Sequence, residues 1–156
     1  MTVHVPFDLA YEMDVRADAD AVYAVLADVP LSVSHFPKVD KLVDMGEGVY
    51  RWEMQRVGTA QVGIQTVYAC KYVSDRKKGT VTWTPVKGVG NAQIQGSWKL
   101  SDRKGATNIV FKTAGKVDVA MPALMKVIVV PVVNGEFEKL VEKYIDNLIG
   151  EFGGEA

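Results

Sequence analysis

The segment from Met121 to Phe152 constrains the fold most, because it has the pattern of one long helix behind a chain rich in strand patterns. Apolar residues in its second half recur at alternating steps of three and one, which makes a single stripe on a helix of about 3.6 residues per turn. The stripe consists of Phe137, Leu140, Val141, Tyr144, Ile145, Leu148, Ile149 and Phe152. This pattern predicts a sheet wrapped around one helix, an arrangement that encloses either a packed core or a binding cavity.

The first part of the chain predicts one strand and two short helices. Large apolar residues from Phe7 to Val15 alternate with Asp8, Ala10, Glu12 and Asp14, which is typical of a strand with one solvent-exposed face. Asp18 is placed to cap a helix that Pro30 ends or redirects, because proline disfavours helical geometry in the residue before it. A second short helix is expected over Leu31–Phe36.

Six further strands are predicted between the short helices and the terminal helix. The gaps between them are short, which favours antiparallel hairpins over crossover connections. The predicted strands are Val39–Met45, Val49–Val57, Gln61–Ser74, Thr80–Thr84, Asn91–Leu100 and Thr107–Val119. The expected fold class is therefore α+β, with a curved seven-stranded antiparallel sheet around the long C-terminal helix.

Length and composition favour a single domain spanning residues 1–156. Hydrophobic residues make up 48% of the chain and charged residues 24%, as in ordinary globular proteins. The formal net charge of −1 gives no electrostatic reason to expect a nucleic acid partner. The start of the chain lacks the basic and apolar stretches of a secretory signal, so a cytoplasmic protein is expected. No cofactor is expected.

The apolar run Val127–Val133 interrupts the amphipathic pattern of the terminal helix. It is far shorter than the roughly 20 residues that span a bilayer, so no stable membrane insertion is expected. Pro131 predicts a kink or a break, with Asn134 capping the second half. The run is either buried all round or partly exposed at a pocket mouth or partner surface. Burial is favoured, and Leu124 and Ile128 are candidates for the wall or gate of a pocket.

Strand alternation gathers aromatic residues on the face that should look toward the long helix. The position of a residue on this face does not tell whether its side chain fills the core or lines a ligand site. Each tyrosine hydroxyl and tryptophan N–H on this face needs a partner when buried, and large apolar surfaces with a few such groups are typical of small-molecule sites. The candidate ligand-binding residues on the sheet are Tyr50, Trp52, Thr66, Tyr68, Tyr72, Trp83, Trp98 and Phe111.

His35 and Phe36 complete the candidate site where the short helices lead into the second strand. His35 is either a polar group at a pocket mouth, an acid–base catalyst or a capped loop histidine, the last being favoured. The spacing of His4, His35 and Cys70 predicts no metal site. Cys70 lies on the apolar face, where a packed thiol is favoured over a reactive one.

The segment Val15–Asp28 and the run Phe36-Pro37-Lys38-Val39 resemble the START-like or SRPBCC superfamily, whose members share the helix-grip fold. The order of predicted elements agrees with that fold over almost the whole chain. The superfamily includes lipid carriers, pollen allergens, polyketide aromatase/cyclases, coenzyme Q-binding proteins and chaperone activators. The resemblance implies binding or transport of a hydrophobic small molecule, such as a lipid, a quinone or a polyketide-like compound. Alternatives are an aromatase/cyclase- or dehydratase-like enzyme using cavity tyrosines, or an interaction module without a ligand. The oligomeric state stays open.

Overall fold

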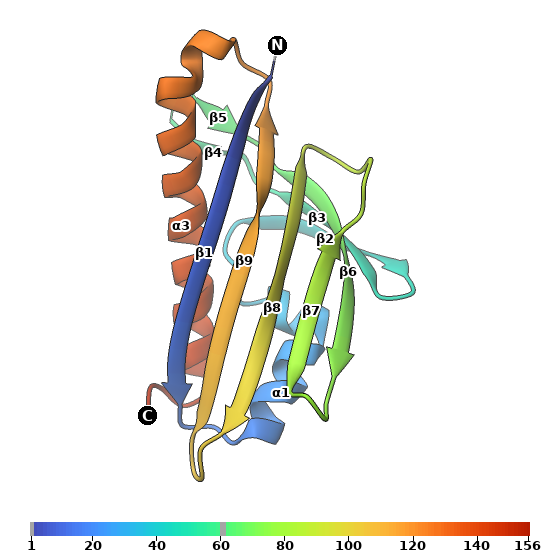
Figure 1. Cartoon of the computed structure of the whole chain (residues 1–156), viewed down its shortest axis with the longest axis vertical. Helices are drawn as coiled ribbons and strands as arrows, with labels where there is room; N and C mark the ends of the chain where they lie inside the picture. Colours follow the sequence, from blue (N-terminus) through green and yellow to red (C-terminus); the bar gives the residue numbers. More distant parts are fainter. Residues whose placement is uncertain (1, 60–61) are drawn as a thin grey trace.

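The computed structural model describes residues 2–59 and 62–156. Its elements follow the predicted order of strand, two helices, several strands and a long helix (Figure 1). They are β1 (Val3–Val15), α1 (Ala19–Ala27), α2 (Val29–Val33), β2 (Val39–Gly46), β3 (Val49–Met54), β4 (Val57–Gly58), β5 (Gly63–Ile64), β6 (Val67–Asp75), β7 (Thr80–Pro85), β8 (Ala92–Asp102), β9 (Thr107–Val119), the 3₁₀ turn η1 (Ala123–Met125) and α3 (Lys126–Glu151).

The main sheet confirms the prediction of seven antiparallel strands. Its spatial order is β1-β9-β8-β7-β6-β3-β2, so that β1 and β2 form its two edges. β1 pairs with β9 along its whole length, from Val3 opposite Val119 to Val15 opposite Thr107. The first strand of the chain therefore lies beside the last one, and the hairpins between β6 and β9 fill the middle of the sheet.

A separate two-stranded sheet, β4–β5, was not predicted from the sequence. The predicted strands Val49–Val57 and Gln61–Ser74 each break here, and Gln61 itself lies outside the described residues. Gly58 has a φ of 117°, which favours glycine, and the Thr59 amide donates to the Val62 carbonyl at 2.8 Å. This local turn takes the chain out of the main sheet before β6 returns to it.

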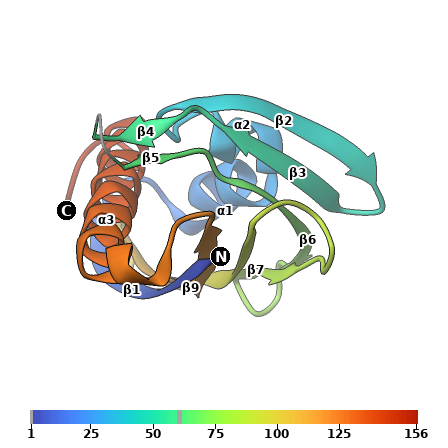
Figure 2. The ribbon, with the colours of Figure 1, turned by 90° about the horizontal axis from the view of Figure 1, so that it is seen from above.

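The sheet bends into a U, and α3 lies along its open side (Figure 2). The helices α1 and α2 lie inside the curve and close its lower end in the view of Figure 1. The predicted stripe of α3 is confirmed, because seven of its residues are buried and Ile149 is half-buried. The core is thus enclosed by the sheet, by α3 and by the two short helices.

Aspartates cap both short helices. The Asp18 carboxylate accepts from the Ala21 amide at 2.8 Å, which confirms the predicted cap of α1. Asp28 accepts from the Leu31 amide at 3.3 Å and caps α2. Pro30 therefore lies in the first turn of α2, where its missing N–H is tolerated, rather than between the two helices.

The helix α3 continues through Pro131, so the predicted break there is wrong. Asn134 lies within the helix and caps nothing. Pro131 is only five residues after the first helical residue, Lys126, so few intrahelical hydrogen bonds precede it. None of the helices in the described ranges 2–59 and 62–156 is long and apolar enough to cross a membrane.

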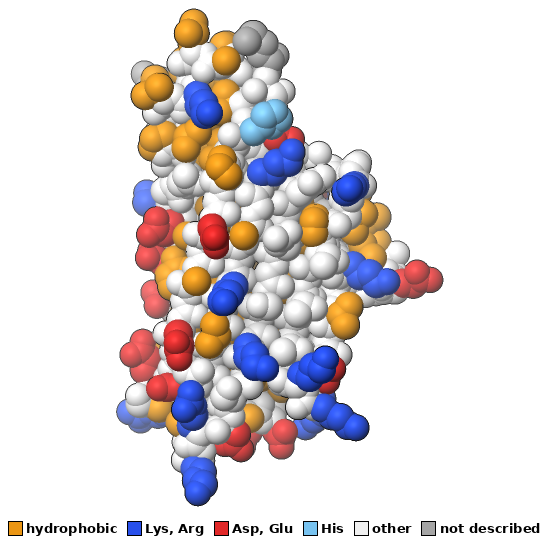
Figure 3. All heavy atoms as spheres, viewed as in Figure 1, with side chains coloured by type: hydrophobic (Ala, Val, Ile, Leu, Met, Phe, Trp, Pro, Cys, Tyr) orange, Lys and Arg blue, Asp and Glu red, His pale blue; other side chains and the backbone are white. Residues whose placement is uncertain are grey.

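The expectation that the run Val127–Val133 is buried is wrong for part of it. Val129 and Val133 are fully buried, whereas Val127 is 83% exposed. Apolar side chains consequently gather on the surface at the end of the molecule where α3 begins (Figure 3). Leu124 and Ile128 belong to this exposed end.

Candidate ligand-binding cavity

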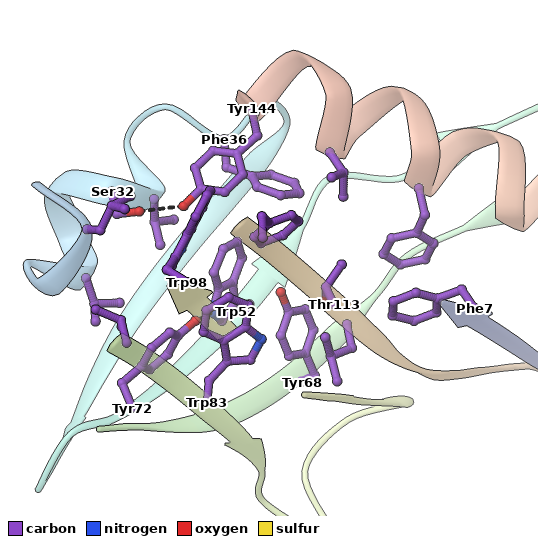
Figure 4. Close-up of a pocket in the computed structure, with 18 residues that line it drawn as sticks. Phe7, Ser32, Phe36, Trp52, Tyr68, Tyr72, Trp83, Trp98, Thr113 and Tyr144 are labelled. Carbon is purple, nitrogen blue, oxygen red and sulfur yellow. Dashed lines mark hydrogen bonds between the residues drawn. The ribbon is translucent and has the colours of Figure 1, made fainter. Parts of the chain in front are cut away.

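An internal cavity of about 60 Å³ lies between the concave face of the sheet, α3 and the two short helices (Figure 4). Side chains from all of these elements point into it. Its lining consists of Phe7, Leu26, Val29, Ser32, Val33, Phe36, Trp52, Tyr68, Tyr72, Val81, Trp83, Ile94, Trp98, Phe111, Thr113, Phe137, Val141 and Tyr144.

Aromatic side chains dominate this lining. Ten of the fourteen aromatic residues in the chain line the cavity, including all three tryptophans. Their rings contact one another around it: Trp52 stacks on Tyr68 with ring centroids 5.3 Å apart, and Trp98 lies 4.4 Å from Phe111. Such contacts fix the orientation of each ring and give the cavity flat walls.

The polar groups of the cavity lining include two hydrogen-bonded pairs and one tyrosine hydroxyl without a partner among the described residues. The hydroxyls of Ser32 and Tyr144 share a hydrogen bond of 2.5 Å, which joins α2 to α3. The Trp52 indole N–H donates to the Tyr72 hydroxyl at 3.0 Å. The Tyr68 hydroxyl points into the side-chain cluster in Figure 4, and no hydrogen bond joins it to any residue in the described ranges. Tyr68 is therefore a free donor for a bound molecule.

No charged side chain is found among the lining residues in the described part of the chain. Burial raises the pKa of the Tyr144 hydroxyl well above its usual value, and its hydrogen bond with Ser32 offsets part of that rise. Burial likewise raises the pKa values of Tyr68 and Tyr72. All three phenols are neutral at physiological pH, so the cavity has no net charge.

Gly96 on β8 makes room for the indole of Trp83 on the neighbouring strand. A Cβ atom at Gly96 would lie 2.3 Å from Cζ2 of Trp83 and 2.4 Å from the carbonyl oxygen of Lys112. Both distances are far below van der Waals contact, so only glycine fits beneath the ring. The absence of a side chain at this position thus determines where Trp83 lies in the cavity wall.

The structure brings together seven of the twelve residues that the sequence nominated. Their rings line one cavity although they come from six different segments of the chain. They are Phe36, Trp52, Tyr68, Tyr72, Trp83, Trp98 and Phe111.

His35 and Tyr50 lie next to the cavity without lining it. His35 Nδ1 donates to the Leu31 carbonyl at 3.0 Å, and its Nε2 lies 3.8 Å from a carboxylate oxygen of Glu151. The histidine therefore caps α2 and faces the end of α3. The Tyr50 ring lies edge-on against the Tyr72 ring with centroids 5.8 Å apart, but does not line the cavity.

The cavity lining does not include Thr66, Leu124 or Ile128. Thr66 is buried against a separate void of about 10 Å³ near Leu140 and the β4–β5 sheet. Leu124 is 93% exposed and Ile128 is 48% exposed, and neither side chain lines the cavity as predicted for a pocket wall. The helix presents a later part, around Phe137, Val141 and Tyr144, to the cavity.

Sequence reasoning missed the contribution of the helices. Nothing in the sequence around Ser32 distinguishes it from an exposed serine. Its burial depends on how α2 packs against α3. Tyr144 was recognised in the α3 stripe, but a stripe does not tell which of its residues reach a void. Phe7, at one end of the cavity, stacks on Phe137 with centroids 5.2 Å apart.

Cys70 does not line the cavity, although it lies between Tyr68 and Tyr72 on β6. Its thiol donates to the Ile94 carbonyl at 3.2 Å, and burial raises its pKa to about 12. A thiol with that pKa is not a nucleophile at neutral pH. In the described ranges, no three histidine, cysteine or acidic side chains come together as a metal-binding group.

Neither a protein-family model nor a curated protein matches the sequence. Solved structures do match it. A START superfamily protein from Mycobacterium smegmatis superposes with a TM-score of 0.68 at 11% identity, over 94% of this chain and 97% of that one. The Zhui aromatase/cyclase from Streptomyces sp. R1128 superposes with a TM-score of 0.64 at 19% identity, over 95% of this chain and 94% of that one.

A third similar structure is the di-domain ARO/CYC StfQ from the steffimycin biosynthetic pathway. Its TM-score is 0.57 at 12% identity, and the match covers 95% of this chain and 51% of that one. Together these similarities show the fold: the chain has the START-like, helix-grip architecture that its sequence resembles. At these identities the similarity extends to the fold alone.

Proposed function

We propose that residues 1–156 form one domain that binds a neutral, largely planar, apolar molecule in its internal cavity. The observation that carries this proposal is the concentration of ten of the fourteen aromatic residues around one uncharged void. A packed core needs no such concentration, since aliphatic side chains fill space equally well. Flat aromatic walls favour a ligand with a flat face.

The polar groups of the cavity favour a ligand with a hydrogen-bond acceptor. The Tyr68 hydroxyl has no partner within the described residues, and Tyr72 accepts from Trp52 while keeping its own hydrogen to donate. A carbonyl oxygen is the simplest group that both would satisfy. Burial of a carboxylate or an ammonium group here would leave its charge without a counter-ion, at a large energetic cost. A quinone or a polyketide-like ketone fits better than an ionised lipid.

The cavity must widen to hold such a molecule. Small-molecule sites usually enclose roughly 300–1,000 Å³, whereas this void has about 60 Å³. Phenylalanine rings that stack on each other, such as Phe7 on Phe137, slide or turn without loss of a hydrogen bond. We therefore infer that binding displaces one or more cavity rings.

A cyclase-like enzyme is the second candidate, because similar structures include aromatase/cyclases. Its chemistry would rest on neutral tyrosine hydroxyls, whose raised pKa values make them weak proton donors and leave almost no tyrosinate to act as a base. The Ser32–Tyr144 pair and Tyr68 would orient a carbonyl compound rather than exchange protons with it. The geometry thus supports binding more strongly than acid–base catalysis.

A matched series of three ligands tests the proposal. Fluorenone is planar, neutral and carries a carbonyl; fluorene lacks the carbonyl; fluorene carboxylate carries a charge. A ligand that binds only the folded state raises the melting temperature, by an amount equivalent to about 2.7 kcal/mol when its concentration is one hundred times Kd. We expect the largest shift with fluorenone, a smaller one with fluorene and none with the carboxylate.

The variant Tyr68→Phe is the control for the carbonyl contact. It should reduce the advantage of fluorenone over fluorene, since the Tyr72 hydroxyl remains, and leave the fluorene shift intact, because only the Tyr68 hydroxyl is removed. A protein whose melting temperature responds to none of the three ligands, and which carries no small molecule in native mass spectrometry, would contradict the proposal. The nearly filled interior would then favour an interaction module.

A further inference from the structure

A second hollow lies on the outside of the cavity wall. This outer groove, of about 360 Å³, runs between α2 and the hairpin of β2 and β3. Its apolar lining is made by Pro30, Val33, Phe36, Val39, Leu42 and Tyr50, and its polar lining by Ser34, Asp40, Lys41 and Asp44. Its volume is within the range of small-molecule sites, unlike that of the internal cavity.

Val33 and Phe36 line both hollows. Val33 is buried in α2, and its β-branched side chain has little rotational freedom. Phe36 is half-buried, and its ring lies edge-on to Trp52 at 5.3 Å and 4.9 Å from the ring of Tyr144. The ring of Phe36 is consequently the movable part of the partition between groove and cavity.

The backbone around Phe36 is held on both sides. The Asn147 side chain donates to the His35 carbonyl at 2.8 Å, and the Gln55 amide donates to the Lys38 carbonyl at 2.8 Å. Phe36 itself donates its amide to the Val33 carbonyl at 2.8 Å. Contacts of the Phe36 ring, in contrast, are ring-to-ring packing without a hydrogen bond. A rotation of the side chain alone therefore requires no movement of the segment.

We propose that the outer groove is the site where the ligand first binds, and that the Phe36 ring is the door through which it passes into the cavity. Rotation of the ring away from Trp52 and Tyr144 joins the two hollows. The occupant is the same neutral planar molecule, because the groove continues into the cavity through apolar side chains. This inference rests on the proposed function for the identity of its ligand. The movement of the Phe36 ring can be tested without a ligand.

The first test measures the access of acrylamide, a small neutral quencher, to tryptophan fluorescence. All three tryptophans are buried and line the cavity, so quenching reports on its opening. Phe36→Ala should increase the quenching constant several-fold over the wild type. The matched control is Phe137→Ala. It also removes a phenylalanine ring from the cavity lining, but Phe137 does not border the groove. Equal quenching constants in the two variants would contradict the proposal that the Phe36 ring controls access to the cavity.

The second test measures association of aminoanthracene, a neutral planar fluorophore, by stopped flow. Most changes in a binding surface alter the dissociation rate, whereas a door limits the association rate. Phe36→Ala should raise the association rate constant by about tenfold, in proportion to the larger open fraction. Asp40→Trp, an exposed substitution in the groove, should lower the association rate constant. Leu124→Ser, which lines neither hollow, should leave it within about twofold of the wild type.

The two tests separate failure of the door from failure of the proposed function. Increased quenching in Phe36→Ala without aminoanthracene binding in any variant would support the door and count against ligand binding. Binding of aminoanthracene with the same association rate constant in wild type, Phe36→Ala and Asp40→Trp would support ligand binding. It would contradict entry from the outer groove past the Phe36 ring.

Discussion

Ser32 and Tyr144 lie 112 positions apart in the sequence and share a buried hydrogen bond of 2.5 Å. The bond holds α2 against α3 at the edge of the cavity. Three residues further along α3, Asn147 donates to the backbone of His35, so that two contacts on one face of the helix hold the same segment. The position of Phe36 depends on this pair of contacts.

Loss of the Tyr144 hydroxyl should destabilise the fold. Tyr144→Phe leaves the Ser32 hydroxyl buried without its partner, which costs about 1–3 kcal/mol of unfolding free energy. Urea denaturation measures the effect. Tyr11→Phe is the control, because Tyr11 is half-buried and forms no hydrogen bond through its hydroxyl within the described residues. In a double-mutant cycle, Ser32→Ala and Tyr144→Phe should be less than additive; strict additivity would contradict a direct bond.

Gly96 should tolerate no side chain. Gly96→Ala places a methyl group against the indole of Trp83 and the Lys112 carbonyl, and such overpacking costs about 1–3 kcal/mol. Tryptophan fluorescence should shift as Trp83 is displaced. Gly135→Ala in α3 is the matched control: nothing lies within 4 Å of its added Cβ, and alanine stabilises a helix by up to about 1 kcal/mol relative to glycine. A stable Gly96→Ala protein with unchanged fluorescence would refute the close contact.

Stability should decrease at alkaline pH. Tyr68, Tyr72 and Tyr144 have pKa values raised above 10.0, so ionisation is favoured in the unfolded chain but not in the folded one. The contribution of these hydroxyls to the unfolding free energy is complete below about pH 10. It is lost as the pH rises further, by up to about 1.4 kcal/mol per pH unit for each group. Urea denaturation between pH 8 and about 11 measures the slope. Tyr144→Phe should make the slope shallower; an unchanged slope would mean that Tyr144 ionises freely in the folded state.

The Cys70 thiol should be unreactive in the folded protein. Its pKa of about 12 leaves almost no thiolate at pH 8, and its side chain is fully buried. Ellman's reagent should therefore label it only after urea unfolding, with one thiol per chain. Rapid labelling under native conditions would show that the sheet opens around β6.

Exposed apolar residues at the start of α3 should contribute nothing to the cavity. Leu124→Ser and Val127→Ser are expected to change the unfolding free energy by less than about 0.5 kcal/mol and to leave the fluorenone shift intact. Val133→Ala, in the same helix but fully buried, should cost about 1 kcal/mol or more. A loss of fluorenone binding in Leu124→Ser would restore the gate that the sequence suggested.

The sequence by itself determined the main sheet and the helices around it, because each of these elements has a local signal, whereas the short β4–β5 sheet has none. The stripe from Phe137 to Phe152 requires a helix with one buried face, and strand alternation places Trp52, Tyr68 and Trp98 on the concave side. These patterns depend only on neighbouring residues, and the order of elements then leaves few ways to cover the apolar faces.

Tertiary structure decided where the cavity lies and what separates it from solvent. Leu124 and Phe137 are both apolar residues of the terminal segment, but only Phe137 meets β1, where it stacks on Phe7. The bond between Ser32 and Tyr144 and the space that Gly96 leaves for Trp83 each join residues distant in sequence. Contacts of this kind arise from how helices dock on a curved sheet, and no local pattern encodes them.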